Sequence, residues 1–269
     1  MFQRPPPQSS LASARAPVTR SVPFVLRFDD LAPALGVGVG AALGVHEWWW
    51  SAIIAAVVGL YMGWRVMPPS RGSLQVRVVC ISDTHGQHRS CTVPEGDILI
   101  HAGDFTRFGR IEDVTDFNQW LGELPHKHKV VVNGNHEHNA EWKKNARAML
   151  SNGVFLLDSE VTVMGVRIFG ANFCWPMREQ NPTYNSIPPG VDIVIAHGPA
   201  KGLVDADVGC RALRSAMAKV RPRLVVSGHI HQARGLATGV GTLRGTTFVN
   251  AAMCKEGYTI GWEPMVVDL

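Results

Sequence analysis

The sequence has few of the features that mark a secreted, disulfide-bonded protein. Its 269 residues include five cysteines, an odd number, and no C-x-x-C pair. This argues against both a disulfide framework and a zinc site built from thiolates. No N-x-S/T glycosylation sequon is present, because Asn181 is followed by Pro182. Both absences predict a domain that faces the reducing cytosol.

Clustered charge is also scarce. Only 18% of the residues are charged, and the net charge is +4. Much of the arginine excess lies in the first 71 residues, so the chain lacks the concentrated basic surface of a nucleic-acid-binding protein. We therefore expect no nucleic-acid polymer as a partner. The hydrophobic content of 46% is ample for a buried core, which excludes a chain that is disordered throughout.

The first quarter of the chain divides into segments of different composition. Residues 1–30 are rich in Pro, Ser and Arg and predict a disordered N-terminal region. Residues 31–67 contain no Lys or Arg before Arg65 and predict a hydrophobic membrane segment. Residues 68–73, PPSRGS, predict a linker. The globular domain is then expected over residues 74–269.

The length of the hydrophobic segment leaves the number of membrane crossings open. One helix over residues 31–67 would be about 55 Å long, against a hydrocarbon core of about 30 Å. Two short arms, 31–45 and 48–66, would form a hairpin with a tryptophan cluster at the interfacial turn. Arginines flank both outer ends of the segment, which favours a hairpin with both ends in the cytosol. A single span, or a buried helix packed on the globular domain, is the alternative.

Five short apolar runs in the globular domain each end in side chains that bind metals well. The runs are VRVVCISDTHG, DILIHAGDFT, KVVVNGNHEH, VDIVIAHGPA and LVVSGHIHQ. Stretches of helical periodicity lie between them at residues 111–124, 140–152 and 209–220. Strands that alternate with helices predict an α/β fold whose strand ends build a site. The polar side chains at these ends are Asp83, His85, Asp104, Asn135, His136, His197, His229 and His231.

These side chains offer more oxygen and nitrogen ligands than one metal ion needs. Mixed imidazole, carboxylate and amide ligation suits zinc, iron or manganese, so we expect two divalent ions, whose identity stays open. Two such ions can activate a water and clamp the oxygens of a phosphoryl group. The carboxylates of Asp83 and Asp104 bring two negative charges against four from the ions, and the remaining positive charge would attract a phosphate ester. Any one cluster taken alone could instead be a polar turn.

The order of the motifs resembles that of the calcineurin-like metallophosphoesterases. ISDTHG, HAGDFT, GNHE, AHGP and GHIH stand in that family's order over residues 76–232, and FVNAAMC is similar to the metallophosphoesterase-domain-containing subgroup. The resemblance implies a two-sheet sandwich flanked by helices. It also implies two ligand sets: Asp83, His85, Asp104 and His231 around one metal, and Asp104, Asn135, His197 and His229 around the other. His136 would face the substrate as the catalytic residue.

The resemblance implies a phosphoric ester hydrolase, with phosphodiesters such as cyclic nucleotides as the leading substrate class. Some members of the subgroup lack the first histidine of GHxH, whereas His229 is present here, so the ligand set is complete. A protein that binds a nucleotide or a partner with little turnover is one alternative, and a protein phosphatase is another. Among the other histidines, His101 is expected in the core, and a solvated position is expected for His88, His126, His128 and His138.

Overall fold

The computed structural model describes residues 75–176 and 180–269 of the chain. The predicted disordered region (1–30), membrane segment (31–67) and linker (68–73) lie outside the described residues. Within the described part of the chain, no helix combines the length and the apolar character needed to cross a lipid bilayer.

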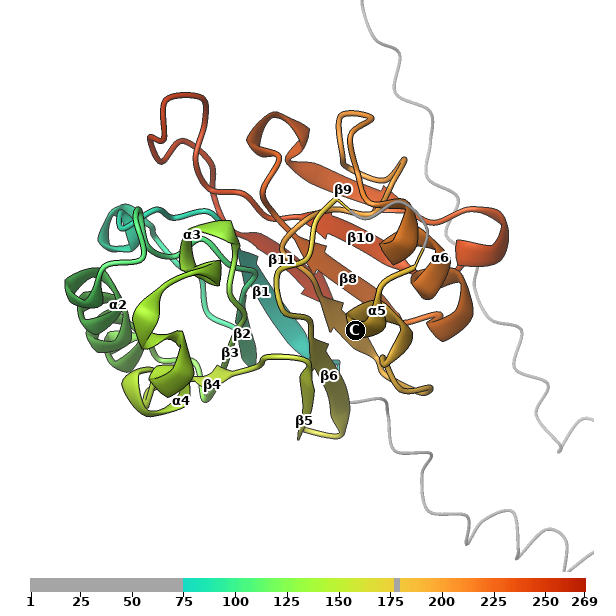
Figure 1. Cartoon of the computed structure of the whole chain (residues 1–269). Coiled ribbons are helices and arrows are strands. Elements are labelled where there is room, and N and C mark those ends of the chain that lie inside the picture. Colours follow the sequence, from blue (N-terminus) through green and yellow to red (C-terminus); the bar gives the residue numbers. More distant parts are fainter. Residues whose placement is uncertain (1–74, 177–179) are drawn as a thin grey trace, which may run out of the picture. The chain divides into compact units, whose positions relative to one another are not determined.

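Two mixed β-sheets form the centre of the fold (Figure 1). Four strands of the first sheet are parallel, and the C-terminal strand β11 lies antiparallel to β1 at one edge. In the second sheet four parallel strands stand between two antiparallel edge strands. The first sheet has the order β11 (Met265–Asp268), β1 (Arg77–Ile81), β2 (Ile98–His101), β3 (His128–Val131) and β4 (Val154–Phe155). The second has the order β5 (Ser159–Val163), β6 (Val166–Gly170), β7 (Ile193–Ile195), β8 (Leu224–Ser227), β10 (Thr247–Asn250) and β9 (Gly235–Thr238).

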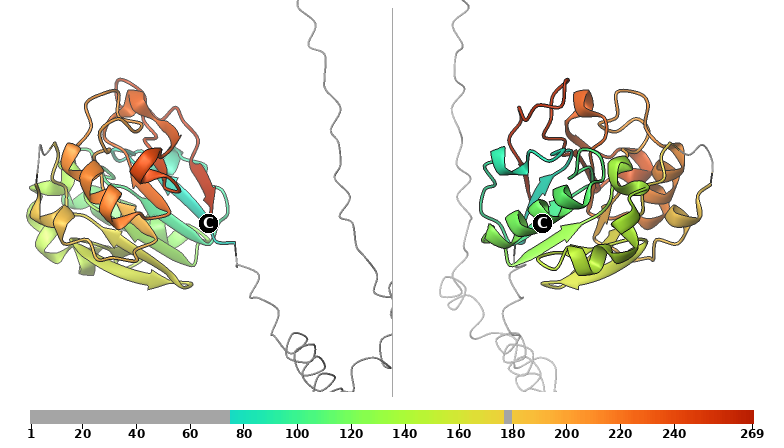
Figure 2. Two further views of the ribbon diagram at one scale, coloured as in Figure 1. Left: turned by 90° about the vertical axis from the view of Figure 1, so that its right-hand side faces the viewer. Right: turned by 60° about the vertical axis from the view of Figure 1, so that its left-hand side comes forward.

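Helices cover the outer face of each sheet, as the sequence predicts. Helices α2 and α4 lie against the first sheet, and α5 and α6 lie against the second (Figures 1 and 2). The α-helices are α2 (Ile111–Glu123), α3 (Asn135–His138), α4 (Ala146–Met149), α5 (Pro182–Asn185) and α6 (Arg211–Val220). Short 3₁₀ turns are η2 (His88–Ser90), η3 (Glu141–Asn145), η4 (His231–Ala233) and η5 (Gly241–Leu243). The expected two-sheet sandwich with flanking helices is thus confirmed.

The central strands are buried on both faces. In β1, Val78 and Cys80 point into the core between the two sheets. Val79 and Ile81 point the other way, into the layer that contains α2. This alternation follows from the period of two in a strand, and it explains why these strands read as continuous apolar runs.

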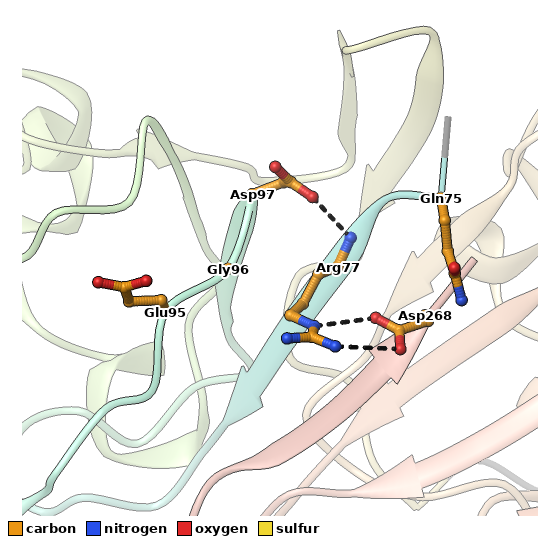
Figure 3. A pocket seen from close by; sticks show the side chains of 6 residues that line it. All are labelled: Gln75, Arg77, Glu95, Gly96, Asp97 and Asp268. Atoms are coloured by element: carbon orange, nitrogen blue, oxygen red, sulfur yellow. Dashed lines mark hydrogen bonds and ion pairs between the residues drawn. The ribbon is translucent and has the colours of Figure 1, made fainter. Parts of the chain in front are cut away.

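An ion-pair cluster ties β11 to β1 at the edge where the parallel strands begin, here called the amino edge. The Arg77 guanidinium donates to the Asp268 carboxylate at 3.0 Å, and the Arg77 backbone N–H donates to Asp97 at 2.8 Å (Figure 3). These residues line a cavity of about 430 Å³. The cluster joins the C-terminal strand to the start of the domain.

The predicted helix over residues 140–152 is broken into two short pieces, η3 and α4. Its apolar positions Trp142, Ala146 and Leu150 are buried as the periodicity predicts. The indole N–H of Trp142 donates to the carbonyl of Gly109 at 2.8 Å, and the Lys143 N–H bonds three residues back to Ala140. The first piece is therefore a 3₁₀ turn, held by the bond from Trp142 to Gly109. The prediction of one continuous helix was wrong.

Two histidines expected in solvent are buried. The Nε2 of His88 lies 2.9 Å from Asp116, and that of His126 lies 2.9 Å from the Pro94 carbonyl. Both partners are about 30 residues away in sequence, so the polar neighbours of each histidine were misleading. His101 is buried as expected, with its Nε2 3.0 Å from the Thr84 hydroxyl.

Candidate metal centre

The side chains predicted from the five strand ends meet where the parallel strands of both sheets end, here called the carboxyl edge. Those from β1, β2 and β3 belong to the first sheet, and those from β7 and β8 to the second. They line or underlie a cavity of about 270 Å³. The cavity is lined by His85, Asp104, Asn135, His136, His229, His231, Gln232, Glu256, Gly257 and Tyr258. The parallel topology therefore brings together residues that are up to 148 positions apart, as for Asp83 and His231.

One group of ligand atoms converges around Asp83. The Nε2 atoms of His85 and His231 are 3.2 Å apart. Asp83 Oδ1 lies 3.2 Å from the His231 nitrogen and 3.9 Å from that of His85. Ligand atoms from these three residues all lie within 4.8 Å of one another. Two imidazoles and a carboxylate directed at one point are the donor set of a transition-metal or zinc site.

A second group of ligand atoms converges around Asp104. His197 Nε2 lies 3.2 Å from Asp104 Oδ2 and 3.2 Å from Asn135 Oδ1. His229 contributes a ring nitrogen to the same group. His197 Nδ1 lies 2.7 Å from the carbonyl of Ala102, which accepts a hydrogen bond from it and orients the ring so that Nε2 faces the site; a metal bound there would take the place of the proton on Nε2. The donor chemistry of this group therefore also fits a divalent ion.

Asp104 connects the two groups. Its carboxylate belongs with His197 and His229, and also to a cluster with His85 and His136. This is consistent with the bridging role that the family resemblance implies. It also places His136, predicted to face the substrate, among atoms near enough to be ligands, because His136 Nε2 is 3.7 Å from Asp104 Oδ2.

The turns that carry the ligands have an unusual backbone. Asp83, His85, Asp104 and His229 all have positive φ, between 44° and 66°. Non-glycine residues rarely adopt this conformation, and it is concentrated at functional sites. Hydrogen bonds hold these turns: the Asp83 N–H donates to Gly103 O and the His85 N–H to Asp104 O, each at 3.0 Å. The ends of β1 and β2 are thereby fixed against each other.

Two glycines allow the ligand turns to approach closely. A Cβ on Gly134 would collide with the carboxylate and backbone of Asp104, and one on Gly228 would collide with Asp83 and Ser82. Steric contacts therefore explain the glycines that begin the GNHE and GHIH motifs. Each glycine lets one ligand-bearing turn pass directly over the carboxylate of another.

The buried carboxylate of Glu137 clamps two of these turns together. It accepts from the backbone N–H groups of Asp104, Thr106 and Gly134 at 2.8–2.9 Å, and from the Thr106 hydroxyl at 2.7 Å. Burial and the neighbouring Asp104 carboxylate raise the pKa of Glu137 to about 7, although the hydrogen bonds from Thr106 and Gly134 act to lower it. Sequence reasoning gave Glu137 no role, although it is the last letter of the GNHE motif.

Aromatic side chains surround the histidines, and sequence reasoning missed all of them. Phe173 and Trp175 lie beside His229, with ring centroids 5.7 and 4.4 Å away. Tyr258 packs edge-on against His85 at 4.6 Å. Nothing in the spacing of these aromatic residues indicated a site, because they come from segments that only the tertiary fold brings together.

The electrostatics of the protein alone already favour bound positive charge. Burial opposes ionisation of Asp83 and Asp104, but the nearby histidines outweigh it, and the pKa of each carboxyl lies below its ordinary value. Burial also acts against a proton on His197, but the two carboxylates raise its pKa to about 9. Burial lowers the pKa values of His85 and His229 to about 4. These two imidazoles are therefore neutral at pH 7, the form that binds a metal.

The chain is similar to several known proteins. A protein-family model described as calcineurin-like phosphoesterase matches residues 76–233. Metallophosphoesterase domain-containing protein 1 of Homo sapiens is 38% identical over 234 residues, covering 72% of this chain and 71% of that protein. UPF0046 protein K07C11.7 of Caenorhabditis elegans is 34% identical over 228 residues, covering 74% of this chain and 77% of that protein. A solved structure described as a novel archaeal phosphodiesterase is similar with a TM-score of 0.39 and 14% identity, covering 72% of this chain and 99% of that chain.

Proposed function

Because the chain belongs to the calcineurin-like phosphoesterase family, we propose that it is a dinuclear metal-dependent enzyme that hydrolyses phosphodiesters such as cyclic nucleotides. The observation that carries the proposal is the pair of ligand groups, which are linked because Asp104 of the second group also clusters with His85 of the first. Asp83, His85 and His231 would hold one divalent ion with Asp104. Asn135, His197 and His229 would hold the other with the same carboxylate. The identity of the metal, among manganese, iron and zinc, is left to measurement.

The chemistry divides between the ions and the protein. Two divalent ions, when bound, activate a water and stabilise charge on the oxygens of the phosphoryl group. The protein fixes the ligand turns through Glu137 and the backbone bonds at Asp83 and His85. A site preorganised in this way needs no rearrangement at the moment of reaction.

His136 is the proposed proton donor to the leaving oxygen. Its Nδ1 is hydrogen-bonded to the backbone carbonyl of Arg107, which orients the ring. In the imidazolium form both ring nitrogens are donors, so Nε2 carries a proton toward the cavity that Asp104 and His136 line. Proton donation of this kind contributes a factor of about 10² to 10⁴ in rate.

The size of the cavity supports a small substrate. Its volume of about 270 Å³ is close to the lower end, about 300 Å³, of typical small-molecule sites. A phosphate group and one attached sugar fit such a space.

A substrate panel tests the proposal. The full-length protein is stripped with a chelator, reloaded with Mn²⁺, and assayed on phosphomonoesters, linear phosphodiesters and nucleoside cyclic phosphates. We expect hydrolysis of diesters that disappears with chelator and returns with Mn²⁺. Hydrolysis of monoesters alone would overturn the proposed substrate class. Calorimetric binding of a nucleotide without any turnover would favour the alternative of a binding protein.

We also propose that residues 31–67 attach the enzyme to a membrane with the catalytic domain on the cytosolic side. The support is the sequence: a long apolar run with arginines on both sides, and a domain with no sequon and no C-x-x-C motif. Full-length protein should stay with membranes through a carbonate wash, because salt and high pH do not weaken apolar burial. Release by the wash, or protection of the domain from protease added to cytosol-side-out vesicles, would contradict the proposal.

A further inference from the structure

A second cavity, of about 520 Å³, adjoins the metal centre. His231, Gln232 and Glu256 line both cavities, and Lys255 and Trp262 complete the second. The two cavities therefore share part of their wall, including the predicted metal ligand His231, and together they are here called the recess. A substrate whose phosphate lies at the metal centre would extend its organic group into the second cavity.

The wall of this second cavity is a hydrogen-bonded hairpin over residues 253–262. Lys255 N–H donates to Thr259 O at 2.8 Å, and Gly261 N–H donates to Met253 O at 3.0 Å. The tip of the hairpin is tied to the first metal motif, because the Gln87 side chain donates to the Tyr258 carbonyl. The hairpin (red, Figure 1) lies at the same end of the molecule as α3. The hairpin is thus hydrogen-bonded both internally and to the residue that follows the first metal motif.

Trp262 is held in place on this hairpin although 41% of it is exposed. The Lys255 ammonium lies 4.6 Å from the centroid of its ring, and the Arg234 guanidinium lies 5.3 Å from it. Gly261 makes room for this arrangement, since a Cβ there would come within 2.6 Å of the Lys255 side chain. Cations near an indole ring stabilise its position by an interaction with the ring quadrupole.

The charges around Trp262 nearly cancel. Lys255 and Arg234 bring two positive charges, and the adjacent residues Glu256 and Glu263 bring two negative charges. A second phosphate would therefore gain little in this cavity. A flat, uncharged ring would stack on the part of the indole that Lys255 and Arg234 leave exposed. The exposed amide of Gln232 offers a donor and an acceptor to the edge of such a ring.

We infer that this second cavity is the subsite for the base of a nucleotide substrate, with Trp262 as its stacking platform. The inference rests on the proposed function and narrows it, since it selects phosphodiesters that carry a heteroaromatic ring. Trp262 and Gln232 are assigned as specificity-determining residues. They take no part in the chemistry at the phosphorus atom.

Binding of two matched ligands tests this subsite without relying on turnover. AMP and ribose 5-phosphate differ only in the base, so the ratio of their Kd values isolates its contribution. With Mn²⁺-loaded full-length protein in calorimetry, we expect AMP to bind about 10 to 100 times more tightly, because stacking of one base is worth about that factor. Trp262→Ala should bring the ratio close to one and leave the Kd for ribose 5-phosphate unchanged, whereas Trp262→Phe should keep most of the preference.

Two controls separate this inference from the proposed function. Trp120→Phe changes a tryptophan in the layer of α2, away from the recess, and should leave the ratio as in the wild type. A wild-type ratio of one, or a ratio that survives in Trp262→Ala, would overturn the subsite even if diesters are hydrolysed. Conversely, a preference for AMP that depends on Trp262, in a protein without any phosphodiesterase activity, would support the subsite and refute the proposed function.

Discussion

Each edge of the first sheet has carboxylates around a cavity, but the two edges differ in the residues that interact with those carboxylates. At the amino edge, Asp97 and Asp268 accept from Arg77, whose side chain is more than half exposed. At the carboxyl edge, Asp83 and Asp104 are buried against imidazoles. The amino-edge cavity is the larger of the two, about 430 Å³ against about 270 Å³. Volume is therefore a poor guide to the functional site in this protein.

The chemistry of the partner residues explains the difference. A guanidinium is permanently protonated and has no lone pair, so the amino edge, with one ion pair and one backbone hydrogen bond, offers no nitrogen ligand to a metal. An imidazole can lose its proton and present a lone pair to a metal. The carboxyl edge also carries strained backbone at Asp83, His85 and Asp104, which the amino-edge residues lack. One edge stabilises the fold, and the other is organised to bind ions.

The largest expected contrast between the edges comes from one substitution on each. Asp104→Asn removes a negative charge that both ligand groups share, so both metal affinity and activity should fall. Loss of a group that merely supports a ligand costs about 10- to 100-fold, and loss of Asp104 itself should cost at least 100-fold in kcat. Asp97→Asn at the amino edge should keep full activity. Elemental analysis and initial rates check both variants, and two ions per chain in active Asp104→Asn protein would refute the shared role.

His136→Ala sharpens the comparison within the carboxyl edge itself. Turnover should drop by a factor of about 10² to 10⁴ because the proton donor is lost. The metal content should stay at two ions per chain, since His136 is assigned to the substrate. His128→Ala, at the amino-edge start of β3, is the matched control and should retain activity. Loss of an ion in His136→Ala would show instead that the cluster of His136 with His85 and Asp104 binds metal.

Glu137→Gln tests the clamp beneath the ligands. Each oxygen of Glu137 accepts hydrogen bonds from two donors. In Glu137→Gln an amide NH₂ group replaces one of these oxygens, so the two donors that face it lose their acceptor. A buried donor without its acceptor costs about 1–3 kcal/mol. We expect a loss of about 2–4 kcal/mol in the free energy of unfolding, measured in urea with chelator present. Glu123→Gln, at a half-exposed surface ion pair with Arg89, should change stability little, and an equal effect of both substitutions would exclude a special role for Glu137.

The sequence predicted the carboxyl edge far better than its surroundings, for a physical reason. Parallel strands must end at the same edge of a sheet, so polar residues at the ends of apolar runs are brought together by topology alone. All eight residues predicted from this argument lie at the carboxyl edge, among them His197 and His231 from the second sheet. The roles assigned within the set stay predictions, because they depend on ions that the geometry suits but does not identify.

The features that were missed depend on contacts between distant segments. Tyr258 and Trp262 reach the recess through a hairpin whose position is set by pairing near the C-terminus. His88 was expected in solvent because its neighbours in sequence are polar, but its partner Asp116 comes from α2. Local patterns report the period of an element and the residues at its ends. They do not report which distant segment covers it.

The smallest expected effect concerns His101, the last residue of β2, which lies at the carboxyl edge but is no predicted ligand. Burial lowers its pKa to about 3, from 6.5. Below pH 6.5 the unfolded chain therefore binds a proton that the folded protein does not, and stability falls as the pH falls. Between pH 7 and pH 5 this one histidine should account for about 2 kcal/mol of lost stability.

His101→Gln keeps a side-chain nitrogen near the Thr84 hydroxyl and removes the titrating ring. The variant is expected to be less stable than the wild type at pH 7, because the ring also packs edge-on against Phe117, with centroids 5.1 Å apart. Its stability should nevertheless fall less steeply between pH 7 and pH 5, by about the 2 kcal/mol assigned to the histidine. Urea unfolding at both pH values, with chelator present so that metal release does not contribute, measures the two slopes. Identical slopes would mean that His101 takes up a proton in the folded protein as readily as in the unfolded chain, and that its burial does not make the carboxyl edge sensitive to acid.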